Sequence, residues 1–505
     1  MKNHPAHFIF LTAFAALLVS FLIFAIPTHA LEPPEEAKVV PIERIVSEGT
    51  VNRTPYFAYV SVRRGDIADV WVPAELLADM NSPVRLSTDR TVFTARVENP
   101  AEKFGLPGLR NLMPNDVIDL DFRAMTDGER RYFNMTGMEA VSGITSTMTD
   151  SRRVIVPPVS GDILIVGHPA LMPERAKVSI PEFKPPDLSA PFSLIWDHVT
   201  RHNPDLSAEE ALPTVKVISP TWFDLADDRG TITNKADWSY TFYAHEKGYA
   251  VWILVSNGFN RDRTTKFLAN QAMQNEFIAR MLVYAKLYGA DGINIDFENL
   301  ANDDAPRFTA FVKLFAEQGR TAGLTMSIDL PYPSNWNTAF DRPALAKAVD
   351  YVAIMTYDEH WGSSPRAGST ASLPWVDAGI QRTLTQIPPE KTLLGIPFYT
   401  REWAETRNAN GRVSVRARTM AMASVDARLE ETGAAIQWLG DKGQHYFQFV
   451  SEDRTYRVWV EDERSIALRM MLVNRYKLAG AAIWRKGFEK PEVWQVIEAA
   501  MAGEG

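Results

Sequence analysis

Residues 291–299 read Asp-Gly-Ile-Asn-Ile-Asp-Phe-Glu-Asn, so polar and apolar side chains alternate along this segment. Successive side chains of a β-strand point to opposite faces, and the segment therefore predicts a strand with one apolar and one polar face. The polar face carries an amide and two carboxyl groups, from Asn294, Asp296 and Glu298. Three such groups in a row are costly to bury, which indicates that they have a chemical task.

Asp296 and Glu298 predict acid–base chemistry. Two neighbouring carboxylates repel each other, so one of them is expected to keep a proton at neutral pH. A carboxylic acid beside an ionised carboxylate is what acid-assisted cleavage of a glycosidic bond requires. A structural polar strand and a divalent-metal site are the alternatives. The metal site lacks ligands at a recognisable spacing, because the pair His198 and His202 stands alone.

Eight β-rich runs can position this segment, and most gaps between them can hold a helix. The runs are 193–199, 215–221, 250–256, 292–298, 325–330, 351–358, 392–398 and 480–484. One gap carries an apolar stripe at helical spacing, formed by Met273, Phe277, Met281, Tyr284 and Tyr288. This alternation over residues 191–505 predicts an α/β fold, a (β/α)8 TIM barrel. Its excess length, at 404–465, predicts a small α+β insertion between strands seven and eight.

In such a barrel Glu298 would lie at the carboxyl end of the fourth strand, where barrel enzymes carry out their chemistry. The apolar residues of the same strand would pack beneath the surrounding helices. They are Ile293, Ile295 and Phe297.

The N-terminal part predicts export. Residues 8–26 form an apolar run broken only by Thr12 and Ser20, and the small residues Thr28 and Ala30 follow. This pattern predicts a signal peptide over residues 1–30, cut after Ala30. The run is close to the length that spans a bilayer, so an uncleaved membrane anchor is the alternative. Either way, we expect the chain outside the cytoplasm, in the extracellular space, the cell wall or the periplasmic envelope.

Three segments separate this signal from the barrel. Residues 31–48 predict a linker, 49–157 a small β-rich α+β domain, and 158–190 a proline-rich connector. The domain contains a weak repeat, in which 70–73 and 92–93 align with 131–133 and 154–156. Each copy predicts a strand, a short helix, a strand, a turn and a strand. The domain loosely resembles the repeat domain named for the N-terminus of copper amine oxidases.

Composition excludes several classes of protein. The chain has 505 residues, of which 46% are hydrophobic, so it is not mainly disordered. A net charge of −9 argues against a general affinity for nucleic acid. The absence of cysteine excludes disulfides, thiolate zinc sites, iron–sulfur clusters and a cysteine nucleophile.

Four motifs in order along the chain resemble family 18 glycoside hydrolases, the chitinase-like barrels. Residues 291–298 are similar to the DxxDxDxE signature of that family. Met355-Thr356-Tyr357-Asp358, residues 395–401 (Gly-Ile-Pro-Phe-Tyr-Thr-Arg) and Trp484 follow on later strands. Together with residues 219–223 and 357–361, they most resemble the bacterial branch that contains spore-cortex-lytic N-acetylglucosaminidases. The resemblance covers the whole predicted barrel.

The resemblance implies a role for each matching residue. Glu298 would protonate the leaving oxygen and then activate water, while the 2-acetamido oxygen of the substrate attacks the sugar and forms an oxazolinium ion. Asp296 would hold the acetamido N–H, and Tyr357 the acetamido carbonyl. Further substrate contacts are implied for Asp291, Asn294, Met355, Asp358, Tyr399, Arg401 and Trp484. No metal ion and no cofactor is needed.

Asn294 departs from the family pattern, which has Asp at this place. An amide cannot share a proton with Asp296, so Asp296 is expected to ionise more readily than in typical chitinases. A second hypothesis is a non-catalytic, lectin-like protein on the same barrel. Such relatives usually lose the acid, whereas Glu298 is present here.

The predicted partner is a polysaccharide that contains N-acetylglucosamine, either peptidoglycan or chitin. Sugar faces stack on indole rings, and most of the 13 tryptophans belong to the predicted barrel. The tryptophans predicted to line a saccharide site fall at or just beyond strand ends, namely Trp222, Trp361, Trp403 and Trp484. Endo- and exo-action are both compatible with the sequence.

Overall fold

The structure is a computed structural model that describes part of the chain. The described residues are 38–45, 51–62, 68–74, 84–86, 92–127, 130–134, 145–149, 152–156, 163–167 and 183–503, except 336, 408 and 409. The predicted signal or anchor at residues 1–30 lies outside these ranges. The predicted linker, residues 31–48, lies partly inside them, and its residues 38–45 form a strand.

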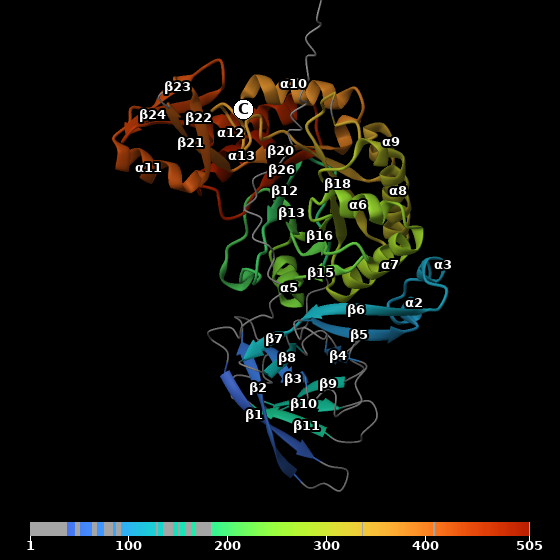
Figure 1. The fold of residues 1–505 in the computed structure, drawn as a ribbon. Coiled ribbons are helices and arrows are strands. Elements are labelled where there is room, and N and C mark those ends of the chain that lie inside the picture. The colour runs from blue at the N-terminus through green and yellow to red at the C-terminus, as the bar shows by residue number, and fades with distance from the viewer. Residues whose placement is uncertain are drawn as a thin grey trace, which may run out of the picture.

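Eight parallel strands form a closed barrel, which confirms the predicted (β/α)8 fold (Figure 1). Their order is β13-β12-β26-β20-β19-β18-β17-β16, and β13 pairs with β16 to close the ring. They are β12 (Phe192–Asp197), β13 (Val215–Pro220), β16 (Ala250–Ser256), β17 (Gly292–Asp296), β18 (Thr325–Pro331), β19 (Tyr351–Met355), β20 (Thr392–Pro397) and β26 (Gly480–Trp484).

Strands β17 and β19 end earlier than predicted, at Asp296 and Met355 and not at residues 298 and 358. The chain turns just after each of them, where Asn299 has φ 54° and Asp358 has φ 62°. A positive φ is incompatible with a continuing strand. Residues immediately past both strands therefore belong to loops at the carboxyl end of the barrel.

Alternation along the strands separates two apolar layers. An interior layer includes Phe192, Leu194, Trp196, Trp252, Leu254, Ala353 and Leu393. The other layer lies between the strands and the helices and contains Ile293, Ile295 and Phe297, as predicted. Phe297 packs against aromatic rings of the surrounding helices, from Phe267, Phe277, Phe308 and Phe311. The polar residues of β17 consequently face the barrel interior.

Helices surround the barrel (Figure 1). They are α5 (Trp238–Glu246), α6 (Arg261–Leu268), α7 (Gln271–Leu287), α8 (Ala305–Thr321), α9 (Arg342–Ala348), α10 (Leu373–Leu384), α12 (Glu463–Arg475) and α13 (Val493–Met501). Most of the predicted apolar stripe of α7 is buried. A short hairpin, β14 (Phe223–Leu225) and β15 (Ile232–Asn234), extends the sheet beside β16.

An antiparallel sheet with one helix projects between β20 and β26. It orders its strands as β22-β21-β25-β24-β23. Their bounds, with those of the helix, are β21 (Tyr399–Arg407), β22 (Val413–Ala421), α11 (Val425–Thr432), β23 (Gln437–Leu439), β24 (Gln444–Ser451) and β25 (Arg454–Val460). The insertion begins at Tyr399, a few residues before the predicted start. At its base, the buried Glu461 pairs with Arg469 of α12 at 2.8 Å and accepts a hydrogen bond from Gln444.

The N-terminal part contains two antiparallel sheets. The larger orders its strands as β7-β8-β3-β2-β1-β11-β10-β9, and the smaller as β4-β5-β6. The strands are β1 (Lys38–Ile45), β2 (Val51–Val62), β3 (Ala68–Pro73), β4 (Val84–Leu86), β5 (Val92–Glu98), β6 (Val117–Arg123), β7 (Met125–Asp127), β8 (Arg130–Asn134), β9 (Thr145–Thr149), β10 (Arg152–Val156) and β11 (Ile163–Gly167). Two short helices, α2 (Pro100–Lys103) and α3 (Leu109–Leu112), lie between β5 and β6.

The predicted repeat is only partly visible in this arrangement. Strands β3 and β8, which carry the aligned segments 70–73 and 131–133, are neighbours and pair Val72 with Phe133. The segments 92–93 and 154–156 lie in different sheets, so the two copies do not form equivalent units. The predicted short helices of each copy fall mostly outside the described residues.

The smaller N-terminal sheet packs against α7 of the barrel. The Tyr284 hydroxyl donates to the carbonyl of Asp121 at 2.9 Å and accepts from its N–H at 2.7 Å. The Asn234 amide donates to the same carbonyl at 3.0 Å, and the Tyr284 and Phe122 rings meet edge to face. Tyr284, one residue of the predicted apolar stripe, therefore packs against the smaller N-terminal sheet.

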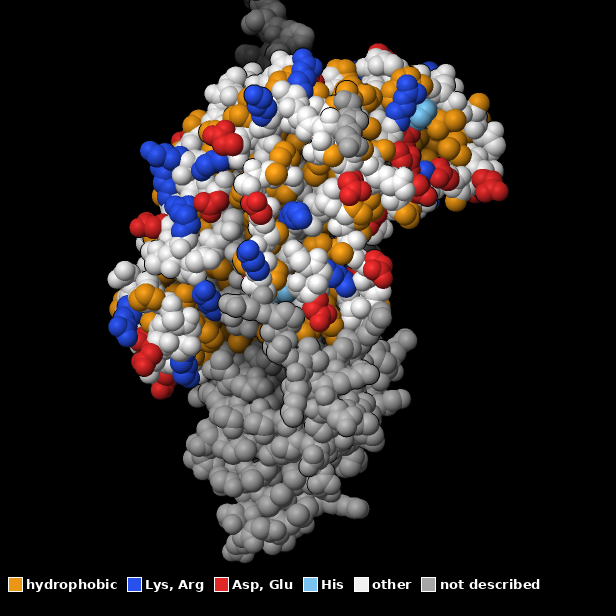
Figure 2. Space-filling model, turned by 180° about the vertical axis from the view of Figure 1, so that it is seen from behind, with side chains coloured by type: hydrophobic (Ala, Val, Ile, Leu, Met, Phe, Trp, Pro, Cys, Tyr) orange, Lys and Arg blue, Asp and Glu red, His pale blue; other side chains and the backbone are white. Residues whose placement is uncertain are grey.

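Charges of both signs are spread over the face of the barrel and insertion seen in Figure 2, with hydrophobic side chains between them. Within the ranges that the structure describes, no helix combines the length and the apolar character needed to cross a membrane.

Gly395 of β20 allows close approach to β19. A Cβ at this position would lie 2.4 Å from the carbonyl oxygen of Ile354 and 3.0 Å from the Cα of Met355. We expect Gly395→Ala to reduce the free energy of unfolding by about 1–3 kcal/mol, because backbone atoms must shift. The melting temperature followed by circular dichroism would report this loss. Gly440→Ala is the matched control, since its nearest contact would be 3.8 Å. Equal melting temperatures for both variants would contradict the prediction.

Candidate active site

Carboxyl groups of two neighbouring strands meet at the carboxyl end of the barrel. Asp296 is the last residue of β17, and Asp329 lies two residues before the end of β18. Ile295 pairs with Ile328, which puts Asp296 and Asp329 at the same level on adjacent strands. Their side chains face the interior, because Ile295 and Ile328 belong to the outer apolar layer. Glu298 follows two residues past the end of β17.

Asn294 connects four strands below these carboxyls. Its Oδ1 accepts from Trp196 Nε1 at 2.9 Å and from Ser219 Oγ at 3.4 Å. Its Nδ2 donates to Ser327 Oγ at 3.0 Å and to Asp329 Oδ1 at 2.9 Å. The amide is fully buried and uses both of its polar atoms, so its orientation is fixed.

Burial controls the ionisation of the carboxyls. It raises the pKa of Asp296 to about 7, and the negative charge of Asp224 adds to the effect. Burial and the charges of Asp296, Asp329 and Asp358 raise the pKa of Glu298 well above its usual range. Glu298 is therefore much harder to ionise than a free glutamate. Burial thus makes Asp296 harder to ionise than a free aspartate, even with an amide at position 294.

Asn257 fixes the backbone of Glu298 from the loop after β16. Its side-chain Oδ1 accepts from the Glu298 N–H at 3.0 Å, and its Nδ2 donates to the Glu298 carbonyl at 2.7 Å. Asn257 is fully buried and also donates to Thr264 Oγ1. These two hydrogen bonds hold the backbone of Glu298 in place, because Glu298 lies beyond the end of β17 and has no strand-to-strand hydrogen bonds of its own.

Asp358 links the barrel to the insertion. Its Oδ1 accepts from Arg401 at 2.6 Å and from the Tyr399 hydroxyl at 2.7 Å. Asp358 has a positive φ, which costs a non-glycine residue of the order of 1 kcal/mol. The two charge-assisted hydrogen bonds offset this strain. Arg401 is buried and donates to Thr419 of β22 as well, so the predicted residues Asp358, Tyr399 and Arg401 form one cluster.

Tyr357 and Trp484 both pack against the interior apolar layer, at the carboxyl ends of the strands. The Tyr357 ring lies edge-on to Tyr399 at 6.2 Å. Burial, followed by the negative charges around it, raises the pKa of Tyr357 well above its usual range, so its hydroxyl remains a hydrogen-bond donor. Trp484 is half-buried and lies 5.9 Å from the ring of Trp196.

Two further predicted site residues are partly exposed on the same side. Met355 ends β19 and shares the inward register with Tyr357. Trp361 lies in the loop between β19 and α10, and its Nε1 donates to Ser363. Both keep part of their side chains accessible to a ligand.

Three predicted substrate contacts are not supported by the geometry. Trp222 is fully buried in the outer apolar layer and donates to Asn203. Trp403 is fully buried as well and donates to the Gly368 carbonyl at 2.8 Å. Asp291 precedes β17 at the opposite end of the barrel, roughly 20 Å along the strand from Glu298. There it accepts from Val251 N–H and pairs with His245, so it holds the base of the barrel.

Three residues around the carboxyls were not predicted from the sequence, namely Asp329, Asn257 and Asp224. A signal for Asp329 was present, because Ser327 and Asp329 alternate with Met326, Ile328 and Leu330 as residues 291–299 do. Asp224 stands on the short strand β14 and pairs with Lys235. Asn257 carried no signal, since a single amide after a strand is common.

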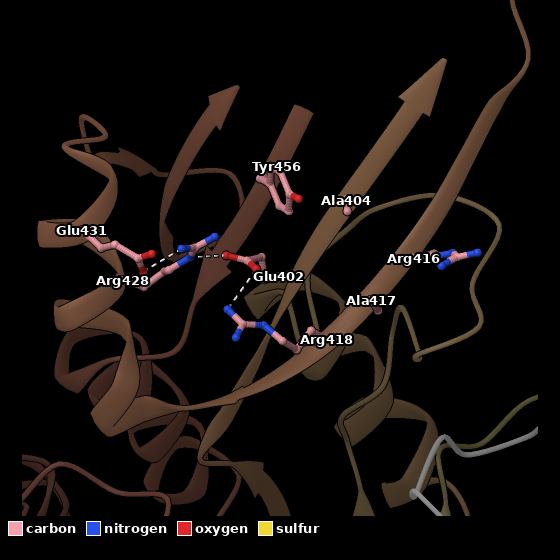
Figure 3. A pocket seen from close by; sticks show the side chains of 8 residues that line it. All are labelled: Glu402, Ala404, Arg416, Ala417, Arg418, Arg428, Glu431 and Tyr456. Carbon is pink, nitrogen blue, oxygen red and sulfur yellow. Dashed lines mark hydrogen bonds and ion pairs between the residues drawn. The ribbon is translucent and has the colours of Figure 1, made fainter. Parts of the chain in front are cut away.

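A cavity of about 400 Å³ lies in the insertion, lined by residues of β21, β22, β25 and α11 (Figure 3). Its lining is Glu402, Ala404, Arg416, Ala417, Arg418, Arg428, Glu431 and Tyr456. Glu402 accepts from both Arg418 and Arg428, and Arg428 also pairs with Glu431, so that three Arg and two Glu leave the lining with a net positive charge. Among the described residues, no group of three or more His, Asp or Glu side chains could hold a metal ion.

Comparison with known proteins points to one family. The family model for glycosyl hydrolases family 18 matches residues 200–488. The glycosylase YvbX of Bacillus subtilis is 25% identical over 286 residues, which cover 54% of this chain and 80% of that protein. The cortical fragment-lytic enzyme of Bacillus anthracis is 27% identical over 250 residues, covering 48% of this chain and 57% of that protein.

Solved structures show the same fold. The spore cortex-lytic enzyme SleL of Bacillus megaterium superposes with a TM-score of 0.55 at 21% identity, covering 62% of this chain and 74% of that chain. A chitinase of Chromobacterium violaceum gives a TM-score of 0.54 at 22% identity, covering 62% of this chain and 99% of that chain. With the family match across the barrel, these findings show that the chain is a glycosidase that belongs to glycosyl hydrolases family 18.

Proposed function

We propose that this glycosidase is exported and cleaves β-1,4 bonds after N-acetylglucosamine in peptidoglycan or a chitin-like glycan. The reaction retains the anomeric configuration and uses the 2-acetamido group of the substrate as nucleophile. The observation that carries the proposal is the pair formed by the buried Asp296 at the end of β17 and the partly exposed Glu298 two residues later. Glu298 has a raised pKa, and Asp296 presents one buried carboxylate oxygen that lacks a hydrogen-bond partner among the described residues.

Each step has a residue with suitable chemistry. Glu298 gives its proton to the glycosidic oxygen as the acetamido oxygen bonds to the anomeric carbon and the glycosidic bond breaks. The unpartnered oxygen of Asp296 accepts the acetamido N–H, and the charge of Asp296 stabilises the oxazolinium ion. The Tyr357 hydroxyl donates to the acetamido carbonyl oxygen. Glu298, now ionised, takes a proton from the water that opens the oxazolinium ring.

The surrounding residues shape the sugar site. Trp484 and Trp361 supply aromatic faces, and Met355 an apolar contact. The Asp358–Arg401–Tyr399 cluster keeps the insertion fixed against the barrel, and Asn294 orients the polar groups beneath. The predicted signal at residues 1–30 and the names of the cortex-lytic relatives support a glycan of the bacterial envelope as substrate.

Glu298→Gln tests the acid. The amide is isosteric but has no transferable proton, so we expect kcat/KM to fall by about 10²–10⁴. Release of reducing ends from chitooligosaccharides and from purified peptidoglycan would measure it, with mass spectrometry of the products. Glu317→Gln makes the same change on the exposed face of α8 and should leave the rate unchanged.

The same pair of variants separates the hydrolase from a lectin-like protein. A wild-type protein that binds glycan without releasing reducing ends would contradict the proposed hydrolysis. Activity retained by Glu298→Gln would instead show that another residue is the acid.

Removal of the acetyl groups tests the nucleophile. Fully deacetylated glycan lacks the acetamido oxygen that forms the oxazolinium ion, so we expect no detectable cleavage at enzyme concentrations that digest the acetylated glycan. Chromatography of digests from matched acetylated and deacetylated oligosaccharides would check this. Efficient cleavage of the deacetylated substrate would exclude the substrate-assisted route.

The pH profile tests the ionisation states. Asp296 must be ionised and Glu298 protonated, so kcat/KM should follow a bell-shaped curve. Its acid limb should fall below about pH 7, where Asp296 binds a proton, and its alkaline limb should fall where Glu298 loses its proton. Initial rates on a soluble chitooligosaccharide across pH 4–10 would measure both limbs. A rate that still rises towards pH 4 would contradict these assignments.

A further inference from the structure

Asp329 is a buried carboxyl that the proposed mechanism does not use. Its side chain is 2% exposed and lies inside the barrel on β18. It stands beside Asp296 at the same level of the neighbouring strand, as the pairing of Ile295 with Ile328 requires. A carboxyl in this place is costly unless it keeps a proton or serves the site.

Asp329 contacts a neutral amide and not a cation. Its Oδ1 accepts from the Asn294 amide at 2.9 Å, and among the described residues no Lys or Arg lies within ion-pair distance of it. Asn294 in turn is fixed by Trp196 and Ser327, so it cannot rotate to offer a different atom. The amide orients the Asp329 carboxyl but can neither supply nor accept a proton.

We propose that Asp329 is a positioning residue of this site, which stores a proton next to Asp296 and thereby sets the charge that Glu298 experiences. The inference rests on the proposed function of Asp296 and Glu298. With Asp329 neutral, Asp296 can ionise without a second charge beside it. When Asp329 ionises at higher pH, its charge makes Glu298 hold its proton more strongly.

The electrostatics of the neighbouring groups agree with this assignment. Burial raises the pKa of Asp329 well above its usual range, and the charge of Asp296 adds to the shift, while hydrogen bonds from Asn294 and Trp196 act in the opposite direction without reversing it. The charge of Asp329 in turn contributes to the raised pKa values of Glu298 and Tyr357. The titratable groups facing this carboxyl from β17 and from the loops after β17 and β19 are Asp296, Glu298 and Tyr357, and Asp224 of β14 acts on Asp296.

Asp329→Asn is the direct test. The asparagine side chain of the variant keeps an oxygen that can accept the hydrogen bond from Asn294. Unlike a carboxyl group, it cannot ionise. The alkaline limb of kcat/KM should move to lower pH by about one unit, because the charge that helps Glu298 keep its proton is gone. The acid limb should stay in place. A merely structural Asp329 would leave the whole pH profile unchanged, and that result would overturn the proposal.

An exchange of the two side chains is a sharper test. Asn294→Asp alone adds a third buried carboxyl beside Asp296 and Asp329, and we expect it to lower both kcat/KM and the melting temperature at pH 8. Combining it with Asp329→Asn returns the site to its original number of carboxyls. The double variant should therefore recover at least part of both losses. A double variant no better than Asn294→Asp would contradict the proposal.

Thermal unfolding tests Asp329 without activity. A carboxyl whose folded pKa lies above its unfolded value stabilises the fold at low pH and loses this contribution as the pH rises through the folded pKa. Asp329→Asn should therefore melt at a higher temperature than the wild type at pH 8 but not at pH 4. If the wild type proves inactive, the proposed hydrolysis fails while this measurement still decides on Asp329. An unchanged difference between pH 4 and pH 8 would overturn the assignment.

Discussion

Three carboxyl groups, those of Asp296, Asp329 and Glu298, act on one another at one end of a closed barrel, and no described cation pairs with them. Asp296 and Asp329 are buried beside the interior apolar layer, and Glu298, which keeps part of its surface exposed, is close enough for their charges to act on it. In such surroundings the charged form of each carboxyl is unfavourable, and each charge that does form opposes the next. The raised pKa values of Glu298 and Asp329 follow from this constraint alone.

The polar contacts around the carboxyls make this burial tolerable. Asn294 satisfies Trp196, Ser327 and Asp329 with a single amide, and Asn257 replaces the missing ladder contacts at Glu298. Neither residue changes its charge with pH. The proton equilibrium therefore remains confined to the carboxyls, which is the condition for one of them to act as an acid near neutral pH.

The insertion contributes to the same site from outside the barrel. Arg401 and Tyr399 stand at the start of β21, and both bind Asp358 just past the end of β19. These hydrogen bonds stabilise the positive φ of Asp358. The preceding residue, Tyr357, packs against the interior apolar layer. At the other end of the insertion, the buried pair of Glu461 and Arg469 joins β25 to α12. The orientation of Tyr357 consequently depends on a segment that is distant in sequence.

The sequence by itself determined the barrel and the inward-facing Asn294 and Asp296, because strand alternation and apolar periodicity are local properties. It predicted Glu298 as the last residue of the same strand, whereas the strand ends at Asp296 and Glu298 lies in the loop that follows. Only the tertiary structure decided that Asp329 adjoins Asp296, that Trp222 and Trp403 are buried, and that Asp291 serves the base of the barrel. These depend on which strands are neighbours and on what covers each side chain, and no spacing along one chain segment encodes either. The raised pKa of Asp296 belongs to the same class, since burial and then the charge of Asp224 set it.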